Sequence, residues 1–187
     1  MDWSTVCLLF VLTAAQSLKT KTINFNAAFV QSDLPTPIYL ELPPGYHVPG
    51  QDKVLKVTKS LYGDVRAAKL WYKHLSRALI DDMGFKTSVI DSCLYYRDDL
   101  CFILYIDDGI ILSNDMAKVD AFIQELEAAG FDLGIEEDYA GYLRVDIKHQ
   151  DDGTIHLSQT GLIDRILADL SLTNSVSTKD TPAAEIL

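Results

Sequence analysis

The stretch Cys101-Phe-Ile-Leu-Tyr-Ile-Asp-Asp-Gly-Ile-Ile-Leu-Ser113 consists of two apolar arms that flank Asp107-Asp108-Gly109. Each arm is short, uncharged and rich in β-branched or aromatic residues, so the stretch predicts two buried strands joined by a tight turn. Glycine accepts the positive φ that such turns need, and aspartate tolerates it. Two neighbouring carboxylates would then lie at the tip of a rigid hairpin. On the local pattern alone a plain reverse turn is the simpler interpretation, because such turns are common.

Other sequence blocks surround this stretch in a fixed order. They are Ala28-Phe-Val-Gln31, Ile38-Tyr-Leu-Glu-Leu-Pro-Pro-Gly-Tyr46, Lys59-Ser-Leu-Tyr-Gly63 with Trp71-Tyr72, and Leu157-Ser-Gln159 with Thr181-Pro182. Together with Tyr105-Ile106-Asp107-Asp108, they resemble the reverse transcriptases of copia-type retrotransposons, whose signature is Tyr-X-Asp-Asp. The blocks cover nearly the whole chain, which makes the resemblance specific.

The order of predicted elements indicates an α+β fold. The chain has 187 residues, of which 48% are hydrophobic and 23% charged, as expected for one globular domain. Helices are expected at residues 4–15, 64–82, 115–129 and 161–170, and strands at 22–25, 38–42, 54–57, 92–97, 101–106, 142–147 and 154–157. The resemblance implies a reverse-transcriptase-like palm, an antiparallel sheet with helices packed on one face, and partial fingers. We expect residues 1–175 to form this domain and residues 176–187 to form a loose tail.

The resemblance also implies a catalytic site, and here the chain departs from the family. The family's first catalytic aspartate stands four residues before an Ala-Phe pair, and that position is Asn24. Asp107 and Asp108 would be the remaining ligands of Mg²⁺ or Mn²⁺. Because Mg²⁺ requires hard, anionic oxygen ligands and asparagine offers a neutral carbonyl, polymerase activity should fall by orders of magnitude. The simpler interpretation of Asn24 is a strand residue near the surface.

Further positions follow from the same resemblance. Phe29 would be the steric gate against the sugar 2′-hydroxyl, although an aromatic residue after a strand is ordinarily part of the core. Tyr62, Gly63 and Arg66 would contact the incoming nucleotide and template, beside Tyr105 of the signature. The implied partners are an RNA or DNA template-primer and a deoxynucleoside triphosphate, bound weakly by this chain alone, and further polymerase segments or another copy of the chain. Two smaller departures from the family are Ala68, in place of proline, and Arg144, in place of glycine.

The charge balance argues against nucleic-acid binding by this chain alone. It has 16 Lys and Arg against 27 Asp and Glu, for a formal net charge of −11. A polymerase neutralises phosphates with basic side chains, so we expect the basic surface in fingers and thumb segments that this sequence lacks. From charge alone, an acidic globular protein that binds no nucleic acid is the simpler interpretation.

The remaining residues indicate an intracellular protein without other metal sites. Cys7, Cys93 and Cys101 show no metal-binding or disulfide pattern, so we expect buried, reduced thiols, and the four histidines are scattered. Residues 6–15 are apolar, but they follow an acidic start and are too few to span a membrane. We therefore expect no signal peptide and a cytoplasmic or nuclear location. A secreted or membrane-associated protein is the alternative if these residues are cleaved or inserted.

Two main hypotheses follow. The first is a fragment of a copia-type RNA-directed DNA polymerase, which performs two-metal nucleotidyl transfer to a primer 3′-hydroxyl and is inactive in this copy. The second is a non-catalytic acidic interaction module, or a decaying gene remnant with a palm fold, which Asn24, Ala68 and Arg144 favour.

Overall fold

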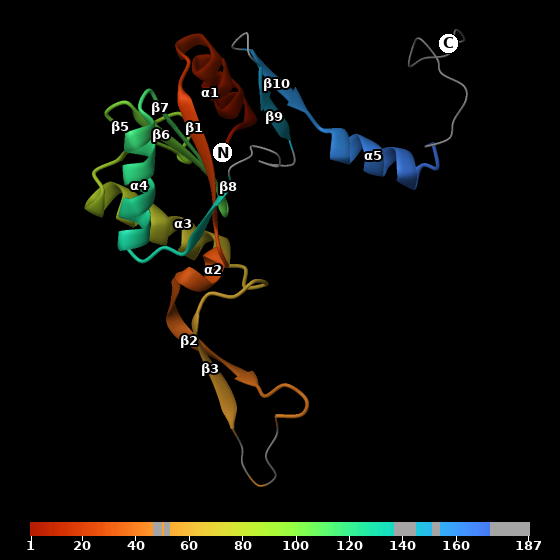
Figure 1. The fold of residues 1–187 in the computed structure, drawn as a ribbon. Helices are drawn as coiled ribbons and strands as arrows, with labels where there is room; N and C mark the ends of the chain where they lie inside the picture. The colour runs from red at the N-terminus through yellow and green to blue at the C-terminus, as the bar shows by residue number, and fades with distance from the viewer. Residues whose placement is uncertain (47–49, 51–52, 137–144, 151–153, 173–187) are drawn as a thin grey trace. The chain divides into compact units, whose positions relative to one another are not determined.

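The chain folds into helices and a mainly antiparallel sheet, which confirms the α+β class (Figure 1). The structure is a computed structural model and describes residues 1–46, 50, 53–136, 145–150 and 154–172. Residues 1–138 and 139–187 form two compact units, and each is described by itself. The first unit contains α1 (Trp3–Gln16), β1 (Lys19–Phe25), α2 (Ala28–Gln31), β2 (Asp33–Glu41), β3 (Val54–Lys59), α3 (Ala67–Arg77), the π-helical turn η1 (Ala78–Asp82), β4 (Lys86–Thr87), β5 (Leu94–Arg97), β6 (Leu100–Tyr105), β7 (Asp108–Ser113), α4 (Met116–Ala128) and β8 (Leu133–Glu136).

The first unit is built on a six-stranded sheet with the order β4-β5-β6-β7-β1-β8. β1 lies between β7 and β8 and runs antiparallel to both, with Asn24 paired to Asp108 on one side and to Gly134 on the other. The predicted strands at residues 22–25, 92–97 and 101–106 are present with shifted ends. β4 and β8 are additional strands that the sequence pattern did not indicate.

One face of this sheet is covered by α3, η1 and α4. The helix positions follow the 3.6-residue period: Trp71 and Leu75 of α3 are buried, as are Phe122 and Leu126 of α4. They pack on alternate residues of the strands, and the main core contains Ile23, Phe25, Phe102, Leu104, Ile111 and Phe131 among others. The Asp115 carboxylate begins α4 by accepting a hydrogen bond from the Ala117 N–H at 2.9 Å.

The opposite face of the sheet is covered in part by α1, which differs from the predicted arrangement of helices on one face. α1 lies on the other side of β1 from α4 (Figure 1). Its residues Val6, Leu9 and Phe10 are buried outside the main core, as are Ile103 and Ile110, whose side chains alternate away from α4. α1 is apolar on all sides, so its sequence could not indicate which side would be covered.

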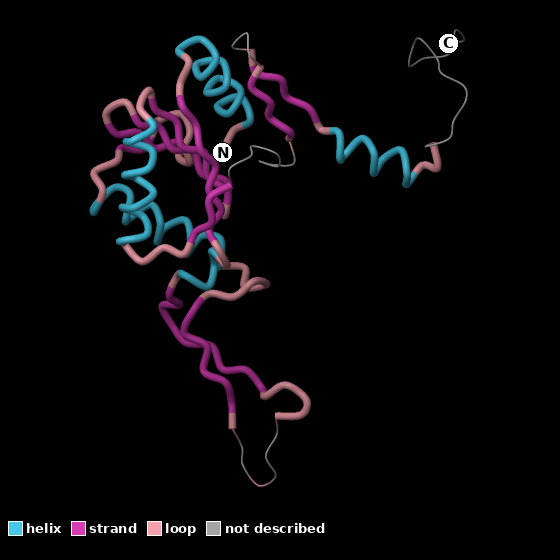
Figure 2. Tube along the Cα trace, viewed as in Figure 1, coloured by secondary structure: helices cyan, strands magenta, loops and turns pink. Residues whose placement is uncertain are grey.

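β2 and β3 form a separate two-stranded hairpin that extends away from the sheet (Figure 2). The strand register shifts between Asp33 and Ile38, where Pro35 and Pro37 cannot donate to the ladder. A hairpin was predicted in this part of the sequence, and its two strands are confirmed.

The second unit contains β9 (Asp146–His149), β10 (Ile155–Ser158) and α5 (Thr160–Asp169). β9 and β10 pair antiparallel, as predicted for these residues. The expected turn at residues 151–153, Arg144 and the predicted tail at residues 176–187 lie outside the described residues.

Two further predictions concern the burial of the cysteines and the absence of a membrane-spanning helix. Cys7, Cys93 and Cys101 are free thiols, as expected, but each is only half-buried and none is fully buried. In the described part of the chain, no helix is both long and apolar enough to cross a membrane.

Candidate active site

The turn between β6 and β7 is formed by Ile106 and Asp107, because Tyr105 pairs directly with Asp108. The predicted turn at Asp107-Asp108-Gly109 is therefore wrong by one position. Ile106, and not glycine, takes the left-handed conformation, with φ at +57°. A β-branched residue rarely adopts a positive φ, so this turn is strained.

Gly109 lies within β7, where the absence of a side chain leaves room for a neighbouring aromatic ring. It faces Leu104 and Ile23 in the neighbouring strands. A Cβ at this position would overlap Cε2 of Phe102 and lie only 2.8 Å from its Cζ. Phe102 is fully buried, so the ring has no free space to move into.

Asn24, Asp107 and Asp108 come together at the end of β1, as the resemblance implies. The Asn24 side chain donates a hydrogen bond from Nδ2 to Oδ1 of Asp108 at 2.7 Å. The next amide, that of Phe25, donates to the carbonyl oxygen of Asp107 at 2.7 Å. Partial burial raises the pKa of the Asp108 carboxyl above its ordinary value, the hydrogen bond from Asn24 opposes this shift, and the charge of Asp107 adds to it.

These three residues do not fit the two-ion centre of a polymerase. The site offers two carboxylates and one amide, and the amide N–H is directed at the Asp108 oxygen that a cation would need. In the described part of the chain, no group of three His, Cys, Asp or Glu residues is placed to hold a metal ion. Asp107 and Asp108, the predicted metal ligands, are thus adjacent, and the side chain at position 24 beside them is a neutral amide that donates a hydrogen bond to Asp108.

Phe29 and Tyr62 form a second cluster. Their ring centroids are 4.7 Å apart; Tyr62 is 59% exposed, and Phe29 packs partly on the main core. Gly63 has φ at +98° with open space around it, which allows the turn before α3. Tyr62 and Arg66 line a groove of about 330 Å³ beside the β2–β3 hairpin. The Arg66 guanidinium donates to the carboxylate of Asp64 at 2.9 and 3.1 Å.

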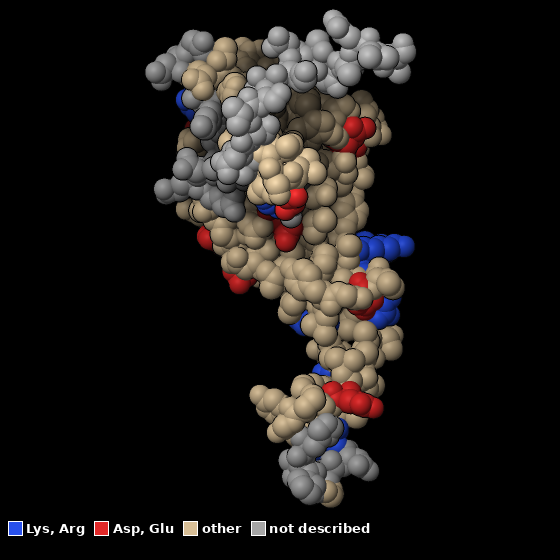
Figure 3. All heavy atoms as spheres, turned by 90° about the vertical axis from the view of Figure 1, so that its right-hand side faces the viewer, with Lys and Arg blue, Asp and Glu red and all other residues tan. Residues whose placement is uncertain are grey.

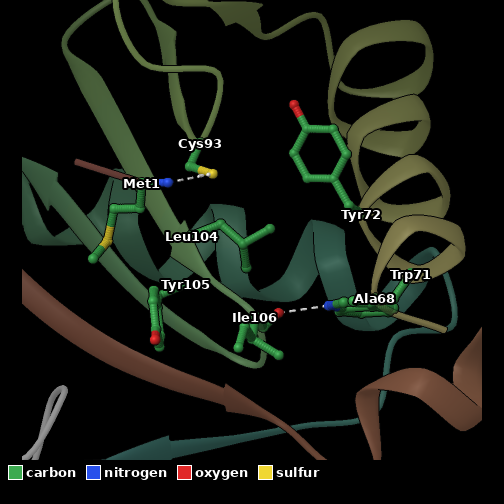
Figure 4. Close-up of a pocket in the computed structure, with 8 residues that line it drawn as sticks. All are labelled: Met1, Ala68, Trp71, Tyr72, Cys93, Leu104, Tyr105 and Ile106. Carbon is green, nitrogen blue, oxygen red and sulfur yellow. Dashed lines mark hydrogen bonds between the residues drawn. The ribbon is translucent and has the colours of Figure 1, made fainter. Parts of the chain in front are cut away.

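Tyr105 lies apart from this second cluster. It is 40% exposed and lines a cavity of about 190 Å³ together with Trp71, Tyr72 and Ile106 (Figure 4). Among the described residues, no hydrogen bond or ring contact joins Phe29, Tyr62 or Arg66 to Asn24 or the two aspartates. The predicted site residues therefore lie in two groups: Asn24 with the two aspartates, and Phe29 with Tyr62 and its neighbours. Tyr105 lies at the turn between β6 and β7.

Two features of the site were missed in the sequence. The first is Trp71, which belongs to a recognised block but was assigned only to the core; its Nε1–H donates to the carbonyl oxygen of Ile106 at 2.6 Å. The second is a basic stretch, residues 53–77, which holds seven Lys and Arg and one Asp despite the acidic total. A local count of charge would have found it. Figure 3 shows basic side chains on the β2–β3 hairpin and where it joins the sheet.

Comparison with known proteins identifies a family that covers nearly the whole chain. A family described as "Reverse transcriptase (RNA-dependent DNA polymerase)" matches residues 1–185. The chain therefore belongs to the reverse transcriptase family.

Its relatives include retrotransposon Pol polyproteins of plants and yeast. The Retrovirus-related Pol polyprotein from transposon RE1 of Arabidopsis thaliana is 30% identical over 176 residues, which are 90% of this chain and 12% of that protein. The polyprotein from transposon TNT 1-94 of Nicotiana tabacum is 27% identical over 88% of this chain and 13% of its own length. The Transposon Ty1-GR3 Gag-Pol polyprotein of Saccharomyces cerevisiae is 27% identical over 68% of the chain and 8% of its own length.

These matches confirm the resemblance to copia-type reverse transcriptases. The chain corresponds to a reverse transcriptase segment of a retrotransposon Pol polyprotein and spans about a tenth of the length of these relatives.

Proposed function

We propose that this chain is the palm and partial fingers of an RNA-directed DNA polymerase whose catalytic centre is disabled at Asn24. The observation that carries the proposal is the hydrogen bond from Asn24 Nδ2 to Asp108 Oδ1 at 2.7 Å. It supports both halves of the proposal. Asn24 of β1 lies opposite Asp108 of the neighbouring strand β7, at the position where a catalytic carboxylate is expected. Its amide hydrogen is directed at an Asp108 oxygen that would otherwise be open to a cation.

The proposed loss of catalysis follows from the charges of the side chains that would hold the metal ions. Nucleotidyl transfer by this class uses two divalent ions held by carboxylates, one for the primer hydroxyl and one for the triphosphate. Replacing one carboxylate by an amide removes a full negative charge and adds a donor that occupies an oxygen of Asp108. The chain's own residues can still hold the turn and the sheet, but they lack the anionic ligand set.

The other predicted positions fit contacts with the substrates of such an enzyme. Phe29 and Tyr62, packed on one another, form an aromatic wall at the base of the β2–β3 hairpin and are suited to contact a sugar or base. Arg66 and the basic stretch are suited to contact phosphates of a template-primer or a deoxynucleoside triphosphate. Such contacts would be made inside the cell, as the sequence predicts.

A second candidate function is binding of nucleic acid without chemistry. The observation that favours it is the basic stretch, because it places seven Lys and Arg beside one Asp in residues 53–77 of a chain that has Asn at position 24. A non-catalytic module of this kind would still bind phosphates through its basic side chains and would not need the metal site.

Primer extension on an RNA template tests the proposal. The chain, Asn24→Asp, Asp107→Asn and the double variant Asn24→Asp with Asp107→Asn are each joined to the thumb of a copia-type relative and assayed with Mg²⁺ and with Mn²⁺. We expect extension only by Asn24→Asp. Extension by the unaltered chain that is lost in Asp107→Asn would contradict the assigned role of Asn24. Extension by none of them would favour the non-catalytic candidate.

A further inference from the structure

The strained turn at Ile106 must be held by contacts from outside the hairpin. A two-residue turn with a β-branched residue at positive φ does not keep this shape by its own preference. Ile106 is also 46% exposed, so burial of its side chain does not account for the conformation. The turn is fixed instead through its two backbone carbonyl groups.

Each of these carbonyls accepts a hydrogen bond from a different element. The Trp71 indole Nε1–H of α3 donates to Ile106 O at 2.6 Å, and the Phe25 amide of β1 donates to Asp107 O at 2.7 Å. Figure 4 shows the indole bond at the edge of the cavity beside Tyr105. The Phe25 bond comes from the backbone and is available to any residue, whereas the Trp71 bond requires an indole.

Trp71 is itself rigid, which makes it suited to fix a neighbouring group. It is 1% exposed, and its ring meets Phe25 edge-on at 5.1 Å between centroids and Phe131 at 6.0 Å. These aromatic contacts hold the indole ring in one orientation, in which its N–H is directed out of the core toward the turn.

We propose that Trp71 is a positioning residue that holds Ile106 in the left-handed conformation and thereby sets the directions of the Asp107 and Asp108 carboxylates. The backbone angles of the turn determine where each Cα–Cβ bond points, so releasing the carbonyl of Ile106 re-aims both side chains. The consequence for the carboxylates rests on the function proposed above, whereas the effect on the turn does not.

The first experiment measures the turn in the chain as it stands, by NMR. Trp71→Phe keeps an aromatic ring in the core and removes the N–H; Trp3→Phe, at an exposed position, is the matched control. In the unaltered chain we expect left-handed ¹³C shifts for Ile106 and an indole proton of Trp71 that exchanges about a hundredfold more slowly than that of Trp3. In Trp71→Phe the Ile106 shifts should move toward extended values, while those of Ile111 and Leu126 stay unchanged.

A folded Trp71→Phe protein with unchanged Ile106 shifts would overturn the proposal and leave Trp71 as a core residue only. If Trp71→Phe does not fold, a benzothienyl analogue of tryptophan at position 71 replaces it, because this side chain keeps the shape of the indole without its N–H. The same shift of Ile106 is then expected, and its absence overturns the proposal.

The second experiment measures Mn²⁺ binding in the Asn24→Asp background. Adding Trp71→Phe should weaken Mn²⁺ binding about tenfold or more, as is typical when a residue that orients metal ligands is removed. An affinity within about twofold of the single variant would overturn the claim that the carboxylates are aimed by this contact. If Asn24→Asp itself binds no Mn²⁺, the proposed function has failed, and the shifts of Ile106 still decide the role of Trp71.

Discussion

At the scale of single residues, Asn24 and Asp108 decide how the site behaves. The amide of Asn24 supplies the hydrogen-bond donor that Asp108 would otherwise lack, and so stabilises a carboxylate that is partly buried beside Asp107. Asn24 and Asp108 therefore form a hydrogen-bonded pair. An aspartate at position 24 would instead place a second carboxylate against that of Asp108.

Restoring the aspartate should therefore cost stability when no metal is present. Asn24→Asp places two carboxylates within hydrogen-bonding distance, which raises their pKa values in the folded state above those in the unfolded chain. The folded protein then binds protons more tightly, so its stability falls as pH rises through the interval between the two pKa values. We expect a loss of about 1–3 kcal/mol at pH 8 that shrinks toward pH 5, measured by urea unfolding in a chelator.

Asn26→Asp is the matched control, because Asn26 donates to the Asp132 carboxylate at 2.8 Å in an exposed pair near the same strand end. Solvent screens that pair, so its variant should lose much less stability. Equal stability of Asn24→Asp and the unaltered chain at pH 8 would show that Asn24 does not relieve Asp108.

The sequence could indicate that Asn24 and the two aspartates lie close together. It could not indicate which residues form the turn between β6 and β7. The Asp-Gly pair predicts a turn at residues 107–109 because it suits turns in general. In the structure the turn lies one residue earlier, and Gly109 lies within β7, where the Phe102 ring and Ile23 leave no room for a side chain. Ile23 belongs to β1, which is far from Gly109 in the sequence, and a local pattern does not contain that contact.

At the scale of elements, the packing of the Phe102 ring of β6 against Gly109 of β7 leaves no room for a larger side chain at position 109. Gly109→Ala should lower the free energy of unfolding by about 1–3 kcal/mol, because the new methyl overlaps the buried Phe102 ring. Gly134→Ala in β8 of the same sheet is the control, since its nearest neighbour is the Asn26 Oδ1 atom at 3.9 Å. Its effect should stay within about 1 kcal/mol. Comparable losses in both variants, measured by chemical unfolding, would refute the packing account of Gly109.

The helices and long strands were predictable from hydrophobic period, whereas the short elements were not. α3 and α4 carry buried residues at helical spacing and lie close to their predicted bounds. β4 has two residues, which is too few for a period to emerge, and the sequence pattern did not mark the four residues of β8. The helix predicted through residue 82 changes to a π-helical turn at Ala78, which its sequence gives no sign of.

At the scale of the molecule, the net charge conceals a local reversal of charge. The total of −11 led to the expectation that the basic surface lies elsewhere, yet residues 53–77 hold seven of the 16 Lys and Arg. Lys69 and Lys73 are exposed on α3 and, among the described residues, take part in no ion pair. A total charge averages over the chain, whereas a bound phosphate responds to the charges within about 10 Å.

Reversing this local charge should weaken binding to nucleic acid. Lys69→Glu with Lys73→Glu should weaken binding to an RNA–DNA duplex and reduce the slope of log affinity against log salt by about 0.9 for each lost phosphate contact. Fluorescence anisotropy at several salt concentrations measures both quantities. Lys86→Glu, an exposed change outside the stretch, is the control for total charge. An equal effect of Lys86→Glu, counted per charge, would count against a specific basic surface.

The central claim is that Asn24 alone prevents this site from binding divalent cations. Electron paramagnetic resonance of free Mn²⁺, titrated with the chain, Asn24→Asp, and Asn24→Asp with Asp107→Asn, tests it most directly. We predict that only Asn24→Asp removes the free Mn²⁺ signal, because only this variant presents three carboxylates. Binding of Mn²⁺ by the unaltered chain as tightly as by Asn24→Asp would contradict the claim.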